Sequence, residues 1–241
     1  AGGGTDIPSY YKLKESYFIS AAINKYVYVS ITKPFEKGIY LKYSRSEKVN
    51  NVKKIKNNII REVLKKYKIN NQIEITTLTD IPARTGLGSS GSFTTGLIKS
   101  IYSFNKKFIE KPNLAEAACD IEINKLKHPS GKQDQYISVY GGISEFNINK
   151  KGKVNSQSLN LHESTIEKLE DNLLLYFTGF SRNSSKILSE QNKKTINKNR
   201  SIIENLNFVQ SLAYEIKNSL LKGDLENFGY LMNEHWKYKI S

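Results

Sequence analysis

The run from Pro82 to Ser92, Pro-Ala-Arg-Thr-Gly-Leu-Gly-Ser-Ser-Gly-Ser, constrains the structure of this chain more than any other stretch. It follows a strand-like segment at 72–78 and opens a helix with apolar residues at regular spacing on one side. Its glycines let the backbone approach a ligand closely, and a helix start leaves amide N–H groups unpaired. Because the helix dipole is also positive at this end, the run predicts a phosphate-binding loop.

This loop does not follow the Walker A pattern. The spacing from Gly86 to Gly91 fits the glycine frame of that motif, but Ser92 and Phe93 stand where Lys and then Ser or Thr should follow. That motif is excluded in its usual form, so the sequence predicts a nucleotide loop of a different kind.

The composition bounds the class of protein. With 241 residues and 38% hydrophobic content, the chain can form one large domain or two small ones with proper cores. It has no stretch of about 18 apolar residues and no charged-then-apolar leader, so we expect neither a membrane-spanning helix nor a secretory signal. The single cysteine, Cys119, rules out an internal disulfide. A reducing compartment, the cytoplasm, is the expected location.

The formal net charge of +14 has two interpretations. A basic patch would indicate binding to nucleic acid or to a membrane surface. The alternative is a Lys/Asn/Ile-rich composition whose lysines are scattered over every solvated face. We favour scattering, because no RNA-binding aromatic motif or zinc pattern accompanies the lysines. We therefore expect no nucleic acid and no membrane as partners, although a positive field would still attract an anionic substrate.

Strand and helix patterns run along the chain without a regular strand–helix–strand alternation, which predicts the α+β class. Strands are expected at 17–32, 38–43, 72–78, 143–148, 154–161 and 173–178. Helices are expected at 51–67, after the glycine loop, at 113–127 with Asn113 as N-cap, and through most of 184–238 with a break near Gly223. A shift in composition places a soft domain boundary at 165–172.

A second informative segment is the turn His128-Pro-Ser-Gly-Lys-Gln-Asp134. The Pro-Ser-Gly turn holds Asp134 on a tight loop, where binding residues are common. Its carboxylate can accept a proton from a hydroxyl held within hydrogen-bond reach. An Asp after a glycine turn is more often a cap or a surface acid, but this one shares the chain with a phosphate loop.

Glu122 is a third candidate. On a helix it shares a side with the apolar residues Leu114 and Ala118, so its carboxylate is not plainly solvent-facing and needs a partner. One possible partner is Mg²⁺ shared with nucleotide phosphates. The commoner alternative is an ion pair with Arg or Lys.

Two weaker signals lie elsewhere in the chain. Thr5 and Asp6 follow a run of glycines and can hydrogen-bond sugar hydroxyls, or form a plain turn before Pro8. Arg182, at the end of Phe-Thr-Gly-Phe-Ser-Arg, can bind a phosphate with two parallel hydrogen bonds, although solvated arginines are commoner. The histidines share no metal-ligand spacing and Cys119 has no activating partner, so neither a metal cluster nor a cysteine nucleophile is expected.

Together these segments resemble the GHMP small-molecule kinases, the family of galactokinase, homoserine kinase, mevalonate kinase and phosphomevalonate kinase. The run 82–92 matches the family's phosphate loop, Pro-x-x-x-Gly-Leu-Gly-Ser-Ser-Ala/Gly, and Pro-Ser-Gly-x-x-Asp matches its catalytic-Asp loop. The opening Gly-Gly-Gly-Thr-Asp-Ile-Pro-Ser-Tyr-Tyr, with Lys-Gln-Asp-Gln-Tyr and Phe-Thr-Gly-Phe-Ser-Arg, is most similar to the D-glycero-D-manno-heptose 7-phosphate kinase branch. The resemblance covers essentially the whole chain.

The resemblance implies the two-domain α+β fold of the GHMP kinases. The expected domains are a ribosomal-protein-S5-like, ATP-binding N-terminal domain at 1–168 and a truncated, ferredoxin-like α/β C-terminal domain at 169–241. The family's first motif begins with a strand and a basic residue before the glycines, and its third motif is a Gly-rich segment near the C-terminus. This chain shows neither feature, so we expect a fragment that lacks both ends.

The resemblance also implies a function: ATP-dependent transfer of the γ-phosphoryl group to a sugar hydroxyl, with Mg²⁺. The first expectation for the acceptor is the anomeric hydroxyl of a heptose 7-phosphate. Asp134 is the implied catalytic residue, and Ser90 and Glu122 are the implied metal ligands. The implied ATP-binding residues are Pro82, Gly86, Leu87, Gly88, Ser89, Ser90 and Gly91. The implied substrate-binding residues are Gly3, Gly4, Thr5, Asp6, Gly131 and Arg182.

Two alternatives to this function stay open. One is another GHMP sugar kinase, similar to galactokinase or fucokinase, that acts on a free sugar. The other is a homologue that senses a sugar or nucleotide without turnover. The oligomeric state is also open.

Overall fold

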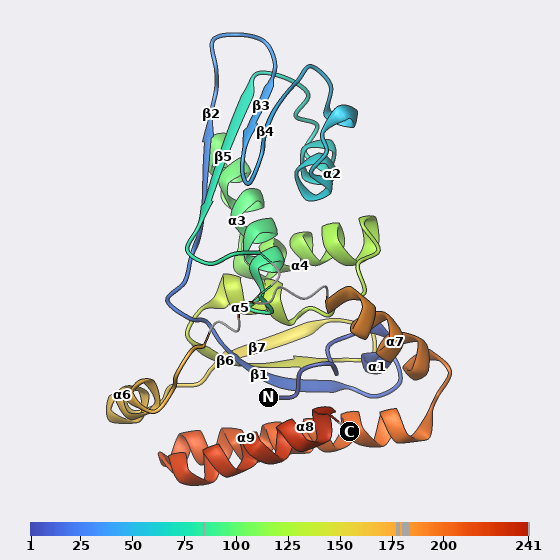
Figure 1. Ribbon diagram of the computed structural model, residues 1–241, viewed down its shortest axis with the longest axis vertical. Helices are drawn as coiled ribbons and strands as arrows, with labels where there is room; N and C mark the ends of the chain where they lie inside the picture. The colour runs from blue at the N-terminus through green and yellow to red at the C-terminus, as the bar shows by residue number, and fades with distance from the viewer. Residues whose placement is uncertain (84, 177–178, 180–183, 241) are drawn as a thin grey trace.

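The computed structural model describes residues 1–83, 85–176, 179 and 184–240, without the side chains of 184–187, 239 and 240. The molecule is elongated, with one sheet upright in the upper half of Figure 1 and a second sheet lying across the lower half. The strands are β1 (Ser16–Ala21), β2 (Val27–Thr32), β3 (Ile39–Lys42), β4 (Ser46–Val49), β5 (Ile73–Thr79), β6 (Ile143–Ile148) and β7 (Val154–Ser158).

The two sheets differ in topology. The upper sheet has the order β2-β5-β3-β4, in which β3 runs parallel to β5 and the other pairs are antiparallel. The lower sheet, β1-β6-β7, is antiparallel throughout. This mixture confirms the α+β class.

The helices are grouped around these sheets (Figure 1). They are α1 (Pro8–Tyr11), α2 (Asn58–Lys66), α3 (Ser89–Phe104), α4 (Lys111–Cys119), α5 (Gln133–Tyr140), α6 (Glu163–Asp171), α7 (Ser184–Ile196), α8 (Arg200–Lys222) and α9 (Leu225–Ile240). Two short segments complete them: the 3₁₀ turn η1 (Val52–Lys54) and the π-helical η2 (Asp120–Lys125). No described helix combines the length and apolar composition that crossing a lipid bilayer requires.

The upper core lies between the sheet and the helices α2, α3 and α4. The apolar residues of the segment 51–67 that recur at helical spacing are all buried: Val52, Ile55, Ile59, Ile60, Val63 and Leu64. From α3, Leu97, Ile98 and Ile101 reach the same core. The hydrophobic period therefore located this packing correctly.

Strand β1 of the lower sheet is buried on both faces. Tyr17 and Ile19 of β1 pack toward α8, whereas Phe18 between them packs against Phe146 and Tyr136 on the side of α5. Successive side chains of a strand point to opposite faces, so β1 joins the two helical layers. This layering places the start of α5 above the sheet and next to the start of α3.

Several predicted elements are wrong. The stretch 17–32 is not one strand: β1 and β2 belong to different sheets, and the exposed residues 22–26 cross between them. The strand predicted at 173–178 is absent from its described part, 173–176, which is exposed. Asn113 is not an N-cap, because the helix already begins at Lys111 with Pro112 in its first turn. The sequence also missed β4 and the break between α7 and α8.

A buried polar network ties the lower sheet to α8. Glu145 of β6 is 5% exposed and accepts hydrogen bonds from Tyr17 Oη at 2.7 Å and from Lys217 Nζ at 2.7 and 2.9 Å. Burial by itself raises the pKa of Glu145, but the bonds from Lys217 and Tyr17 outweigh it, so the pKa is lowered from 4.5. The carboxylate is therefore ionised and depends on these donors.

We expect Lys217→Met to destabilise the fold by roughly 2–4 kcal/mol at pH 7, because it leaves a buried carboxylate with one donor. A carboxylate with a lowered folded pKa stabilises above its unfolded pKa, and this stabilisation is lost as the pH falls through the folded pKa. The difference between variant and wild type should thus shrink below about pH 4. Urea unfolding at several pH values measures it. Lys237→Met removes an exposed partner of Glu234 on α9 and should leave the unfolding transition unchanged. If it lowered stability as much as Lys217→Met does, the buried network would not explain the effect of Lys217→Met.

Candidate active site

The glycine loop lies between the upper and lower halves of the molecule, where α3 begins (Figure 1). Gly86 and Gly88 have φ of 83° and 72°, the left-handed region that favours glycine, and Gly88 is the N-cap of α3. No side chain of the described residues caps this helix start. A Cβ built on Gly86 would meet nothing within 4 Å. The backbone at Gly86, just before α3, therefore borders open space, which leaves room for a phosphate near the helix start.

Asp134, in the first turn of α5, packs against this loop. A Cβ on Gly91 would lie 2.8 Å from the Cβ of Asp134, and one on Gly88 would lie 3.1 Å from its Cγ. Only glycine lets the two helix starts approach this closely. The structure therefore brings the phosphate loop and the predicted catalytic carboxylate to one place.

Glu122 lies beside the same loop, on the π-helical turn η2. It is 3% exposed. Its Oε2 accepts a hydrogen bond from Ser90 Oγ at 2.6 Å, and its Oε1 accepts one from Gln135 Nε2 at 3.0 Å. The ring of His128 is 3.8 Å from Oε2. The described partners include no Arg or Lys, so the ion pair weighed for Glu122 does not form here. Single π-helical turns such as η2 are frequent at functional sites.

The two carboxylates have pKa values shifted in opposite directions. Burial raises the pKa of Glu122, but the nearby His128 ring and the hydrogen bonds from Ser90 and Gln135 outweigh burial and lower it from 4.5. The pKa of Asp134 is raised to about 6, first by burial and then by the negative charges of Asp6 and Glu122. Asp134 is open to solvent on one side while protein atoms crowd its others. Such a split is typical of one group that stays ionised and one that exchanges a proton near neutral pH.

A second glycine-rich segment, Gly2 to Asp6 at the N-terminus, contacts the same site through Asp6. This carboxylate is 5% exposed; its Oδ1 accepts from Gly4 N and its Oδ2 from Gln133 N, both at 3.0 Å. Burial raises its pKa, and these backbone bonds only partly oppose that. A Cβ on Gly131 would lie 1.8 Å from Asp6 Oδ2. Asp6 thus joins the N-terminal loop to the Pro-Ser-Gly turn.

The remaining predicted substrate residues are placed differently. Thr5 is fully buried, and its hydroxyl bonds with Gly2 O and Ser16 Oγ, so it serves the loop's own structure. Gly3 and Gly4 adjoin the side chains of Gln133 and Gln191. Arg182 lies outside the described residues.

Ser90 and Glu122 fit a magnesium site of the kind that nucleotides complete. Hard cations prefer oxygen ligands, and protein-bound Mg²⁺ often has only one or two of them, the rest being phosphates and water. No described group of three His, Cys, Asp or Glu residues could hold a metal by itself. The hydroxyl and carboxylate side by side at a phosphate loop match that requirement.

Sequence reasoning missed three polar side chains in and around the Pro-Ser-Gly turn. Lys132 is buried and donates to Glu116 Oε1 at 2.6 Å and Gly152 O at 2.7 Å. Gln135 holds Glu122, and His128 lies beside it. The segment from His128 to Tyr136 contains all three, but no spacing rule shows which of its polar side chains turn inward.

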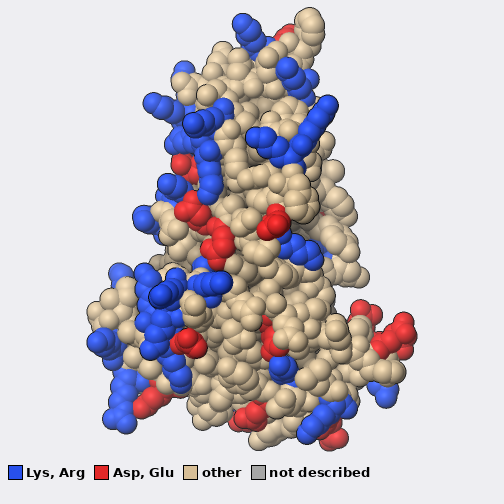
Figure 2. Space-filling view, turned by 180° about the vertical axis from the view of Figure 1, so that it is seen from behind, with Lys and Arg blue, Asp and Glu red and all other residues tan. Residues whose placement is uncertain are grey.

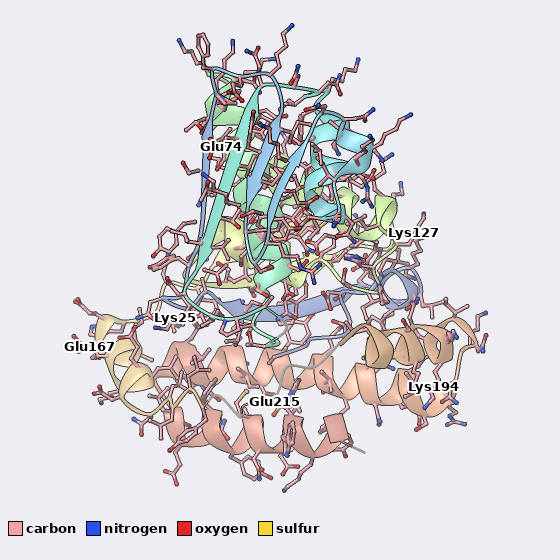
Figure 3. All side chains as sticks on the ribbon, turned by 45° about the horizontal axis from the view of Figure 1, so that its top comes forward. Lys25, Glu74, Lys127, Glu167, Lys194 and Glu215 are labelled. Atoms are coloured by element: carbon pink, nitrogen blue, oxygen red, sulfur yellow. The ribbon has the colours of Figure 1, made fainter. Side chains whose placement is uncertain are left out.

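Positive charge is less evenly spread than the sequence indicated. In the view from behind, Lys and Arg are dense along the left side and also occur at the upper right and the bottom, while Asp and Glu lie in the middle, at the lower right and at the bottom (Figure 2). Lys127, which precedes the Pro-Ser-Gly turn, and Lys194 of α7 lie on the densely basic side of the molecule in Figure 3. Lys and Arg are thus denser on one side of this face, although they also occur elsewhere on it.

The fold and the site define an α+β protein in which a helix start, without a side-chain cap from the described residues, lies beside two carboxylates. The sequence profile described as "GHMP kinases N terminal domain" matches residues 50–142. These residues are therefore similar to the N-terminal domain of the GHMP kinases.

The D-glycero-alpha-D-manno-heptose 7-phosphate kinase of Campylobacter jejuni is 28% identical over 99% of this chain and 74% of its own length. The L-fucokinase/L-fucose-1-P guanylyltransferase of Bacteroides fragilis is 26% identical over 68% of this chain and 18% of its own length.

Solved structures agree on the fold. A D-glycero-D-manno-heptose 1-phosphate kinase from Bacteroides thetaiotaomicron superposes with a TM-score of 0.79 at 23% identity, over 99% of this chain and 75% of that one. The mevalonate kinase of L. major, solved with R-mevalonate, gives 0.63 at 15% identity, over 95% of this chain and 70% of that one. The expected GHMP kinase fold is confirmed.

Proposed function

We propose that this chain acts as an ATP- and Mg²⁺-dependent sugar kinase whose acceptor is a heptose phosphate. The observation that carries the proposal is the contact of Asp134 with Gly88 and Gly91, next to the Ser90–Glu122 pair. The similarity to heptose phosphate kinases along 99% of the chain supports the acceptor. The domain boundary at 168/169 is kept as part of this proposal.

Each residue has a role in the transfer. The amides from Gly86 to Gly91 hold the phosphates of ATP, and Ser90 with Glu122 would hold Mg²⁺, which neutralises phosphate charge when bound. Asp134 orients the acceptor hydroxyl and takes its proton as the oxygen attacks the γ-phosphorus and ADP leaves. The loop of Gly3, Gly4 and Asp6, whose shape Thr5 maintains, forms the sugar side of the site together with Gly131 and Arg182.

The test is a panel of acceptors with the full-length protein. We expect ADP release with heptose 7-phosphate to exceed that with fucose or galactose at least about tenfold, since a pocket built for polar groups rejects acceptors that lack them. ³¹P NMR should show phosphate on the anomeric oxygen. EDTA should stop the reaction and Mg²⁺ restore it.

Other results favour the alternatives. Faster turnover of a free sugar would establish the galactokinase- or fucokinase-like reaction, which the match to a fucokinase makes the second candidate. If the protein bound nucleotide but released no ADP with any acceptor in the panel, it would be a sensing homologue.

A further inference from the structure

Gln135 follows the candidate base directly, but the reaction as described gives it no role. It lies in the first turn of α5, is 2% exposed, and donates from Nε2 to Glu122 Oε1 at 3.0 Å. The other oxygen of that carboxylate, Oε2, accepts from Ser90 of the phosphate loop. The two oxygens of Glu122 therefore have different partners, one on α5 and one at the loop.

The orientation of the Gln135 amide follows from the negative charge of the Glu122 carboxylate. A reversed amide would set its oxygen against the ionised carboxylate of Glu122, so the NH₂ group must face Glu122. In this orientation Gln135 Oε1 is buried and accepts no hydrogen bond from the described residues. A buried acceptor without a partner costs free energy, a cost that an apolar side chain would not have. What offsets it is the bond that Nε2 makes to Glu122.

We propose that Gln135 is a positioning residue for the metal-binding carboxylate: it holds Oε1 of Glu122 and so leaves Oε2 directed at Ser90 and the phosphate loop. This inference rests on the proposed function, because it takes Ser90 and Glu122 as the Mg²⁺ ligands. A carboxylate without a second donor can rotate about its last bond and offer the metal either oxygen. Hydrogen bonds to ligating carboxylates prevent this, and their loss typically weakens metal binding about 10- to 100-fold.

The test measures metal binding rather than turnover. Mn²⁺ is titrated by electron paramagnetic resonance into the full-length protein saturated with a non-hydrolysable ATP analogue. We expect Gln135→Met, similar in length but without a donor, to bind Mn²⁺ about 10- to 100-fold more weakly than wild type. Metal-free nucleotide affinity should not change. Gln135→Asn keeps the amide but falls short of Glu122, so it should also lose affinity.

Gln210→Met is the matched control. Gln210 is also a buried glutamine, on α8, and its Oε1 accepts from Tyr17 N at 3.1 Å. Its removal should lower the melting temperature but leave Mn²⁺ affinity at the wild-type value. If Gln135 had a purely structural role, Gln135→Met would behave like Gln210→Met: a lower melting temperature with wild-type Mn²⁺ affinity.

Each outcome decides the question. Wild-type Mn²⁺ affinity in folded Gln135→Met overturns the inference while the proposed function stands. A wild-type protein that binds no metal–nucleotide complex overturns the proposed function, and this inference with it. If neither Gln135 variant folds, a crystal structure of wild type with Mg²⁺ and the ATP analogue decides: metal on Oε2 with Gln135 on Oε1 supports the inference, and metal on Oε1 overturns it.

Discussion

Asp134→Asn should lower kcat by about 10²- to 10⁴-fold, the usual size of a lost general base. Asparagine has nearly the same shape and keeps the contact with Gly88 and Gly91, so the phosphate loop should keep its geometry. Nucleotide affinity should therefore stay close to wild type. Steady-state kinetics and calorimetric titration of the ATP analogue measure the two quantities separately.

The control is Asp224→Asn, at the start of α9. Asp224 accepts from Asn227 N at 3.0 Å as a helix cap, and asparagine caps a helix equally well. This variant should turn over at the wild-type rate. If Asp134→Asn did the same, Asp134 would have no part in the mechanism.

The pH dependence provides a second check on Asp134. Because its pKa is raised to about 6, the wild-type rate should fall as the pH drops through 6 and the carboxylate becomes protonated. The same shift affects stability. Above pH 6 the ionised side chain opposes folding, whereas below the unfolded pKa of 3.8 it is protonated in both states and contributes nothing. Asp134→Asn should accordingly melt at a higher temperature than wild type at pH 7.5 and at the same temperature near pH 3.

Gly131→Ala should both destabilise the protein and abolish most activity. The new methyl group would lie 1.8 Å from Oδ2 and 2.2 Å from Cγ of Asp6. The Asp6 carboxylate is buried and held by Gly4 N and Gln133 N, so it cannot move aside without losing both hydrogen bonds. Their loss should cost roughly 2–4 kcal/mol, measured by urea unfolding, and would release the turn that carries Asp134.

A rescue and a control separate the clash from other effects. In the double variant Gly131→Ala with Asp6→Ala the obstacle is gone, so stability should equal that of Asp6→Ala alone. Gly229→Ala on α9, where a Cβ meets nothing within 4 Å, should be neutral or slightly stabilising. If the double variant were less stable than Asp6→Ala by the full single-variant loss, the contact with Asp6 would not be the cause.

Local signals accounted for much of the fold. The strand β5, the glycine loop and α3 lie where the pattern predicted them, because turn chemistry and hydrophobic period act within a few residues. The same reasoning failed at 17–32, since an uninterrupted run of β-forming residues does not show that the chain leaves one sheet for another at 22–26. It failed at Asn113 because Pro112 competes for the helix start.

The site shows the same division. Sequence alone determined which groups are available: an amide-rich helix start, a serine beside it, and acidic residues at 122 and 134. Only the tertiary structure decided that Asp134 packs on Gly91, that Gln135 turns inward to Glu122, and that Asp6 bonds to Gln133, which is 127 residues away in the chain. Backbone preferences act over a few residues and cannot specify contacts between distant segments. These contacts arise because α5 packs on the lower sheet with its start next to the start of α3.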